Sequence, residues 1–305
     1  MAERVLTLPG QGGEPSLLLR CCAGTGRAVL YVHGATFPSA LSAGYRFGGR
    51  SWLDDLASHG FDAWAFDFAG YGGSERYAEM DGPREAAPLG RAGEAAKQIA
   101  RVVDYVVEAT GFERVSLTAH SWGSIPAALY ATQRPDRVDA LCLFGPIVQR
   151  STHGLPPPES TGAWRIVSVA DQLARFIEDV PAGHTPVLID EELRTWGPAY
   201  LATDPMASSR EPPSVKIPGG PSADILASWS GYLPYAPEKV TAPTLIVRGE
   251  WDSVSDDADA DWLLSHIAAP VRKDVKVAKG THLMHLERSR DGLFAAVRAF
   301  LTERD

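Results

Sequence analysis

The segment Arg114-Val-Ser-Leu-Thr-Ala-His120-Ser121-Trp122-Gly123-Ser124 decides how the rest of this sequence is interpreted. An apolar run leads into Ser121, and the mostly small residues Ile-Pro-Ala-Ala-Leu-Tyr-Ala follow at 125–131. Small residues around a serine allow a sharp turn between a strand and a helix, which lifts the serine oxygen above the sheet. Pro126 fits the first turn of a helix, where its missing N–H would have no intrahelical partner. We therefore expect a buried strand, a tight turn at Ser121 and a helix.

Such a turn can also belong to an ordinary strand and helix in which Ser121 only caps the helix. The pattern Gly-x-Ser-x-Gly is changed at its first position to Ala119, whereas Gly123 is retained. A serine nucleophile needs a base to take its proton and a third group to orient that base. Asp252 follows one apolar run and His282 follows the next. The order serine, acid, histidine, each after its own strand, is the order expected for this kind of turn.

Short apolar runs separated by helical patterns predict the fold class. The runs interpreted as strands are Ser16–Arg20, Ala28–Val32, Ala63–Phe68, Val115–Ala119, Ala140–Phe144, Thr244–Val247 and Asp274–Ala278. Helical spacing of apolar residues appears in Trp52–Ala57, Ile99–Val107, Trp262–His266 and Leu293–Leu301. Strands that are apolar throughout are covered on both faces, and strands alternating with helices form parallel sheets. We predict an α/β fold with a mostly parallel central sheet flanked by helices.

One stretch interrupts this alternation. Of the 23 prolines, 13 lie between Ser151 and Pro237, so long strands are not expected there. The same stretch is rich in tryptophan, tyrosine and phenylalanine, which a mere linker would not need. Helical patterns occur at Trp164–Asp179 and Glu191–Leu201. We predict a mainly helical insertion, residues 147–235, that interrupts a core formed by residues 1–146 and 236–305.

Composition excludes several classes of protein. The chain has 305 residues, a net charge of −9, 45% hydrophobic and 22% charged residues, which is typical of a globular protein rather than a disordered one. The acidic balance argues against a nucleic-acid partner. Cys21, Cys22 and Cys142 form no CxxC pattern, so we expect buried free thiols and neither a disulfide framework nor a zinc site. No signal peptide and no apolar run of about 18 residues is visible, which favours a soluble cytoplasmic protein without a membrane span.

The sequence resembles the α/β-hydrolase-fold serine hydrolases, in particular the lidded, esterase-like members. The motifs that carry the resemblance are Tyr31-Val-His33-Gly34, Phe66-Asp67-Phe68-Ala69-Gly70-Tyr71-Gly72-Gly73-Ser74, Ala119-His120-Ser121-Trp122-Gly123, Gly249-Glu250-Trp251-Asp252 and Gly280-Thr281-His282. They cover nearly the whole chain except the proline-rich insertion, which falls late in the sheet where lidded members carry a cap. The resemblance implies a mainly helical cap there.

The resemblance also assigns roles. It implies that Ser121 is the nucleophile, His282 the general base and acid, and Asp252 the carboxylate that orients the histidine. Glu250 is an alternative to Asp252. No metal or cofactor is implied.

Other histidines of the sequence are expected to have supporting roles. His285 is interpreted as structural, and His33 as a support for the loop that follows it. The side chain of His120 should point away from Ser121, because successive strand residues leave on opposite faces.

An acyl-transfer reaction also needs backbone N–H groups that stabilise the oxyanion. We expect these from Trp122 and from Ala35, with Thr36 as the alternative; otherwise the Thr36 hydroxyl would satisfy local backbone. Arg46 and Arg50 could bind a substrate carboxylate, although a solvated surface position is expected for both.

The resulting prediction is a serine hydrolase that cleaves a carboxylic ester of moderate size, with apolar or aromatic groups, through an acyl-enzyme. An amide, lactone or thioester hydrolase would use the same residues, and a ligand-binding receptor on a hydrolase scaffold is the alternative outside enzymology. The expected partner is a small-molecule ester. No heptad pattern predicts an oligomer.

Overall fold

The computed structural model describes residues 3–150, 161–186, 188 and 190–303. Its centre is an eight-stranded sheet in the order β1-β2-β4-β3-β5-β6-β9-β10. The strands are β1 (Glu3–Leu8), β2 (Leu17–Cys22), β3 (Ala28–Val32), β4 (Asp62–Phe66), β5 (Val115–His120), β6 (Val138–Phe144), β9 (Thr244–Gly249) and β10 (Arg272–Val277). β1 and β2 pair antiparallel at one edge, and every pairing from β4 to β10 is parallel. The predicted α/β class and mostly parallel sheet are confirmed.

Helices cover both faces of this sheet because successive side chains of each strand point to opposite faces. On one face, Val29 and Tyr31 of β3 share a hydrophobic cluster with residues of α1 (Trp52–Ser58) and α8 (Arg290–Thr302). On the other face, Leu30 and Val32 pack in a second cluster with α2 (Ala92–Thr110), α3 (Ser124–Gln133) and α7 (Asp257–His266). The continuously apolar strand sequences are thus explained by burial on both sides.

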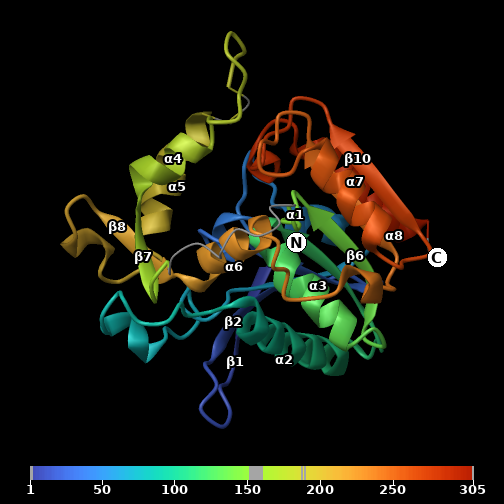
Figure 1. Cartoon of the computed structure of the whole chain (residues 1–305), viewed down its shortest axis with the longest axis horizontal. Helices are drawn as coiled ribbons and strands as arrows, with labels where there is room; N and C mark the ends of the chain where they lie inside the picture. The colour runs from blue at the N-terminus through green and yellow to red at the C-terminus, as the bar shows by residue number, and fades with distance from the viewer. Residues whose placement is uncertain (1–2, 151–160, 187, 189, 304–305) are drawn as a thin grey trace.

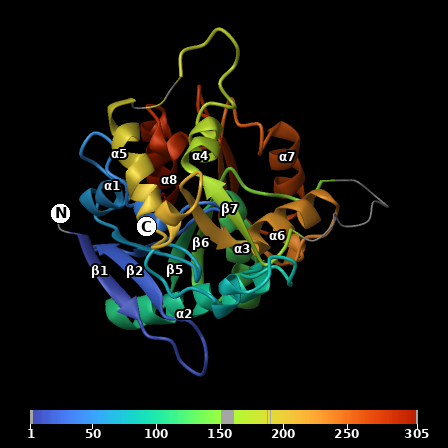
Figure 2. The ribbon, with the colours of Figure 1, turned by 90° about the vertical axis from the view of Figure 1, so that its left-hand side faces the viewer.

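All seven strands expected from the apolar runs are present, with ends that agree or differ by at most two residues. β1 was not expected, because Glu3-Arg-Val-Leu-Thr-Leu8 contains no apolar run like those of the central strands, and its side chains are partly buried or exposed. This strand lies at the sheet edge, as Figure 2 shows, and needs fewer buried apolar residues than the central strands do.

The segment between β6 and β9 contains α4 (Val169–Arg175), α5 (Asp190–Leu201), α6 (Gly220–Trp229) and a two-stranded antiparallel sheet of β7 (Trp164–Ser168) and β8 (Ser214–Pro218). Figure 1 shows β7, β8, α4 and α5 grouped at one side of the molecule and β10, α7 and α8 grouped at the other. The helix predicted over Trp164–Asp179 is present only over Val169–Arg175, and the prediction was wrong for the five residues Trp164–Ser168. These form β7, which pairs with a strand about 50 residues later, and a pattern within one segment does not reveal such a pairing.

The remaining features of the fold are its cysteines, the lengths of its helices and its short 3-10 turns. All three cysteines are buried thiols outside any disulfide. Among the helices of the described ranges, none is both long and apolar enough to cross a lipid bilayer. The remaining short elements are the 3-10 turns η1 (Ser39–Leu41), η2 (Ala78–Asp81), η3 (Ser121–Gly123), η4 (Ala207–Ser209), η5 (Pro237–Lys239) and η6 (Met284–Leu286).

Candidate active site

Ser121 occupies the sharp turn between β5 and α3 that the sequence predicts. Its φ angle is 53°, in the left-handed region that a residue other than glycine rarely adopts. Holding a residue there costs on the order of 1–3 kcal/mol, and such strain is commonly found at functional sites. The turn also comes very close to the loop after β3, because a Cβ on Gly123 would lie 2.4 Å from the carbonyl oxygen of His33. This contact explains why a glycine is needed two residues after the serine.

Three predicted residues meet at the carboxyl end of the sheet. The Oγ of Ser121 lies 2.8 Å from Nε2 of His282. Nδ1 of the same histidine lies 3.0 and 3.1 Å from the two carboxylate oxygens of Asp252. The residues follow β5, β10 and β9, parallel strands whose carboxyl ends share one edge of the sheet.

The hydrogen bonds assign a tautomer to His282. The carboxylate of Asp252 can only accept, so Nδ1 carries the proton and Nε2 accepts from the Ser121 hydroxyl. Asp252 is itself held by the amides of Val254 and Ser255, which donate to its Oδ1 at 2.9 and 3.0 Å. The group can therefore withdraw a proton from Ser121 while the histidine keeps its orientation.

Glu250, the alternative acid, faces elsewhere. Its carboxylate accepts a hydrogen bond of 2.9 Å from the backbone amide of Lys279 and does not meet His282. Of the two candidate acids, the structure joins only Asp252 to the histidine.

The loop after β3 lies beside Ser121. Gly34, Ala35 and Thr36 line the same cavity as the serine. In the described part of the chain, the amides of Ala35 and Thr36 donate no backbone hydrogen bond, so both remain open as oxyanion donors. The Thr36 hydroxyl accepts from the side-chain amide of Gln172 at 3.2 Å rather than satisfying local backbone, so that expectation was wrong.

His33 fixes this loop. Its Nε2 accepts the amide of Phe68 at 3.0 Å, so its Nδ1 carries a proton and donates to the Gly34 carbonyl at 2.7 Å. The hydroxyl of Tyr71 donates to the Ala35 carbonyl at 2.7 Å. Burial lowers the pKa of His33, which keeps it neutral. These contacts agree with the predicted supporting role of His33.

The expected direction of His120 was wrong. Its side chain lines the cavity with Ser121, and its Nε2 donates to the backbone carbonyl of His282 at 3.0 Å. The sharp turn at Ser121 breaks the strand alternation on which the expectation rested. Burial and the neighbouring His285 and His282 lower the pKa of His120 well below its ordinary value, so it stays neutral.

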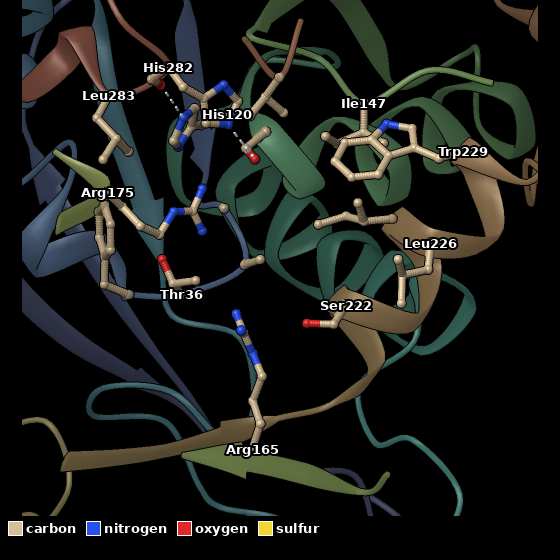
Figure 3. Close-up of a pocket in the computed structure, with 16 residues that line it drawn as sticks. Thr36, His120, Ile147, Arg165, Arg175, Ser222, Leu226, Trp229, His282 and Leu283 are labelled. Carbon is tan, nitrogen blue, oxygen red and sulfur yellow. Dashed lines mark hydrogen bonds between the residues drawn. The ribbon is translucent and has the colours of Figure 1, made fainter. Parts of the chain in front are cut away.

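The candidate site opens into a cavity of about 240 Å³. Figure 3 shows Ile147, Leu226 and Trp229 along one side of it, and Arg165, Arg175 and Thr36 along another. Arg165 comes from β7 and Arg175 from the end of α4. Neither arginine was predicted from the sequence, although each stands among apolar residues of the insertion, which was the available signal.

Arg46 and Arg50, considered earlier as carboxylate ligands, do not line this cavity. Arg46 pairs with Asp54 at 2.8 Å and with Glu3 at 3.3 Å. Arg50 pairs with Asp55 and Asp291. Both are partly exposed, as the surface interpretation predicts.

The insertion is attached to the turn that carries Ser121. The indole Nε1 of Trp122 donates to the carboxylate of Asp224 in α6 at 3.1 Å. The same carboxylate accepts the amide of Ala92 at 2.7 Å and bonds Arg91, so it also joins the start of α2. The buried side chain of Asp224 thus connects the insertion to the turn that carries Ser121 and to the start of α2.

Comparison with known proteins identifies the fold family. The model of the alpha/beta hydrolase fold family matches residues 27–289. The chain belongs to the α/β-hydrolase fold family. A search of curated protein sequences finds no match.

Solved structures similar to this α/β hydrolase include several kinds of enzyme. A thioesterase domain from the curacin biosynthetic pathway aligns with a TM-score of 0.67 at 18% identity over 99% of this chain and 100% of its own. An epoxide hydrolase from Vigna radiata aligns with a TM-score of 0.67 at 15% identity over 99% and 98%. A thermophilic esterase from Thermogutta terrifontis aligns with a TM-score of 0.62 at 17% identity over 100% and 99%. At these identities the structural similarity establishes the fold alone. The reaction has to be inferred from the residues of the site.

Proposed function

We propose that this α/β hydrolase is a serine hydrolase that cleaves carboxylic esters of moderate size through an acyl-enzyme. The observation that carries the proposal is the continuous hydrogen-bonded series from Ser121 through His282 to Asp252, with 2.8 Å and 3.0 Å links. A serine in this arrangement, rather than an aspartate, favours acyl transfer over the opening of an epoxide.

In the proposed reaction, Oγ of Ser121 attacks the ester carbonyl while its proton passes to Nε2 of His282. The tetrahedral intermediate places its negative oxygen on the amides of Trp122 and Ala35, with Thr36 as the alternative to Ala35. The carbon–oxygen bond to the alcohol breaks, and the alcohol leaves with the proton from His282. A water molecule, deprotonated by the same histidine, then releases the acid and restores Ser121.

The cavity supports a substrate of limited size with an apolar part. Its volume of about 240 Å³ lies just below the range for small-molecule sites, on the order of 300–1,000 Å³. Ile147, Leu226 and Trp229 present an apolar wall to one part of the substrate. We propose residues 147–235 as a cap over a core of residues 1–146 and 236–305, since α6, β7 and α4 supply part of the lining.

A panel of short acyl esters, lactones, amides and thioesters tests the proposal, with Ser121→Ala as the control. We expect turnover of esters by the wild type and loss of about 10⁴-fold or more in the variant. Undiminished ester turnover by Ser121→Ala would exclude the mechanism. A dominant rate on a thioester, lactone or amide would keep Ser121 as the nucleophile and replace the substrate class.

A fluorophosphonate probe separates an enzyme from a receptor on a hydrolase scaffold. Both would be labelled once at Ser121. Multiple turnover on the panel supports the enzyme, whereas labelling without turnover on any member supports the receptor. The prediction of a small-molecule partner is common to both.

A further inference from the structure

Two arginines face the cavity, one without an acidic partner among the described residues and the other with a single long contact to an acid. Figure 3 shows the guanidinium groups of Arg165 and Arg175 extending into the cavity, beside Thr36 and Ser222. Arg165 makes no ion pair with any described residue, and its Nε is buried without a hydrogen-bond partner. Arg175 has one contact with an acid, an Nε–Oε1 distance of 3.5 Å to the half-exposed Glu178.

This arrangement is costly for the free protein. A buried guanidinium nitrogen that lacks an acceptor, as Nε of Arg165 does, loses hydration without compensation, and a second positive charge adds repulsion. Burial lowers the pKa of Arg165, opposed in part by Tyr71, and the nearby Arg175 lowers it further. An anion bound between the two arginines would satisfy the free donors and remove the repulsion. By comparison, the buried Arg248 elsewhere in the chain has the carboxylates of Asp257 and Asp274 as partners.

We propose that Arg165 and Arg175 bind a carboxylate carried by the substrate, so that the preferred ester is an anion with one apolar part. This inference rests on the proposed esterase function and specifies its substrate class. The planar fork of an arginine matches the two oxygens of a carboxylate. The Ser222 hydroxyl, which faces the same region, can donate a further hydrogen bond.

The cavity also orients such a substrate. Its apolar side, formed by Ile147, Leu226 and Trp229, lies apart from its cationic side, and His282 lies at one end of the cavity between them (Figure 3). An ester with its carbonyl at Ser121 can therefore direct its apolar group to one side and its carboxylate to the other. A substrate without the carboxylate would leave Arg165 unpaired and Arg175 with only its contact to Glu178, in a site that has lost its water.

Matched esters test the proposal on either side of the scissile bond. For the acyl side we would compare monomethyl adipate with the methyl ester of adipic acid monoamide. For the alcohol side we would compare 4-acetoxybenzoate with 4-acetoxybenzamide and with 4-acetoxyphenyl phosphate. In at least one pair, kcat/KM for the carboxylate should exceed that for the neutral amide by about 10–100-fold, as expected for hydrogen bonds to a charged group.

Variants assign this preference to the two arginines. Arg165→Gln and Arg175→Gln should each lower the ratio of the two kcat/KM values about tenfold, and Arg165→Lys should lower it less. Arg114→Gln is the matched control, because Arg114 is exposed at the opposite end of β5 from Ser121 and should leave the ratio unchanged. Circular dichroism and the melting temperature of each variant would show whether it is folded.

Equal rates within both pairs would overturn the proposal, as would an unchanged ratio in folded Arg165→Gln and Arg175→Gln. A faster reaction of the phosphate than of the carboxylate would overturn the choice of a carboxylate. If the wild type hydrolyses no ester, binding still separates the two proposals. Calorimetry with the Ser121→Ala protein should detect adipate but not adipamide, and Arg165→Gln in that background should weaken adipate binding about tenfold.

Discussion

The carboxylate of Asp179 accepts a hydrogen bond of 3.1 Å from the backbone amide of His282. Its second oxygen accepts from the hydroxyl of Ser253, directly after Asp252. Asp179 follows α4 in the segment between β6 and β9, whereas its two partners lie in the loops after β10 and β9. One side chain of the insertion therefore connects the loops that carry the acid and the histidine of the candidate site.

Asp179→Ala should lower kcat about tenfold and change KM less, because the unpaired amide costs about 1–3 kcal/mol and lets His282 shift. Asp179→Asn should restore part of the loss, since its carbonyl can still accept the amide hydrogen. The readout is kcat and KM on an ester that the wild type hydrolyses. Asp261→Asn, an exposed carboxylate of α7, should change neither parameter. A normal kcat in Asp179→Ala would show that this contact does not position the histidine.

Substitutions of the two candidate acids, Asp252 and Glu250, should have opposite effects on activity. Asp252→Asn should lower kcat by about 10⁴-fold, because an amide can donate to Nδ1 and thereby impose the wrong tautomer on His282. Glu250→Gln should keep most of the activity, since its acceptor oxygen can still bind the amide of Lys279. Steady-state kinetics of both variants on one ester decide the assignment. Loss of activity in Glu250→Gln with activity retained in Asp252→Asn would reverse it.

Local sequence is sufficient to predict the fold class and to bring Ser121, Asp252 and His282 forward as candidates. Each stands just after a short apolar run, and parallel strands place such positions at one edge of the sheet. These signals extend over only a few neighbouring residues, which limits what they can predict. The direction predicted for the His120 side chain was wrong because the turn at Ser121, with its φ of 53°, ends the alternation of the strand.

The insertion was the least predictable part, for a physical reason. β7 exists because it pairs with β8, about 50 residues later, and such a pairing leaves no signal within Trp164–Ser168 alone. Arg165 lies in that strand, and its place in the cavity follows from the pairing. Asp179 and Arg175 depend in the same way on how α4 packs against the core.

Gly145 gives a steric test of the same site. It follows β6 with a φ of 52°, and a Cβ there would lie 2.9 Å from Nδ1 of His282 and 3.0 Å from Oδ2 of Asp252. Gly145→Ala should therefore separate the two side chains and lower kcat by about 10-fold or more, since small displacements of reacting groups are expensive.

Gly111→Ala is the matched control for backbone strain. Its φ is 77°, and no atom lies within 4 Å of an added Cβ. Both variants should lose stability in a urea titration, whereas only Gly145→Ala should lose activity in its folded state. Equal activities of the two would mean that the histidine and the aspartate tolerate the methyl group.

His285 is a buried group whose protonation opposes folding. Its ring lies 4.6 Å from that of His120, 5.3 Å from Phe144 and 6.2 Å from Phe37, measured between centroids. Both ring nitrogens are buried and have no partner among the described residues. Burial, with a smaller effect of His282, lowers the pKa of His285 to about 3. Between about pH 6.5, where the unfolded chain takes up the proton, and pH 3, the folded chain lacks it, so stability is lost as the pH falls.

His285→Phe should therefore stabilise the protein, and increasingly so in acid. Near pH 7 the gain should be about 1 kcal/mol, because two unsatisfied buried nitrogens are replaced by carbon in an aromatic environment. Below pH 6 the gain should grow by at most about 1.4 kcal/mol per pH unit, the limit for one proton. Urea unfolding between pH 4.5 and 8 measures the free energy of both proteins, and His33 and His120 contribute to each. His59→Phe, at an exposed histidine after α1, should leave the pH dependence unchanged. Parallel pH curves for the wild type and His285→Phe would mean that His285 is protonated as readily in the folded chain as in the unfolded one.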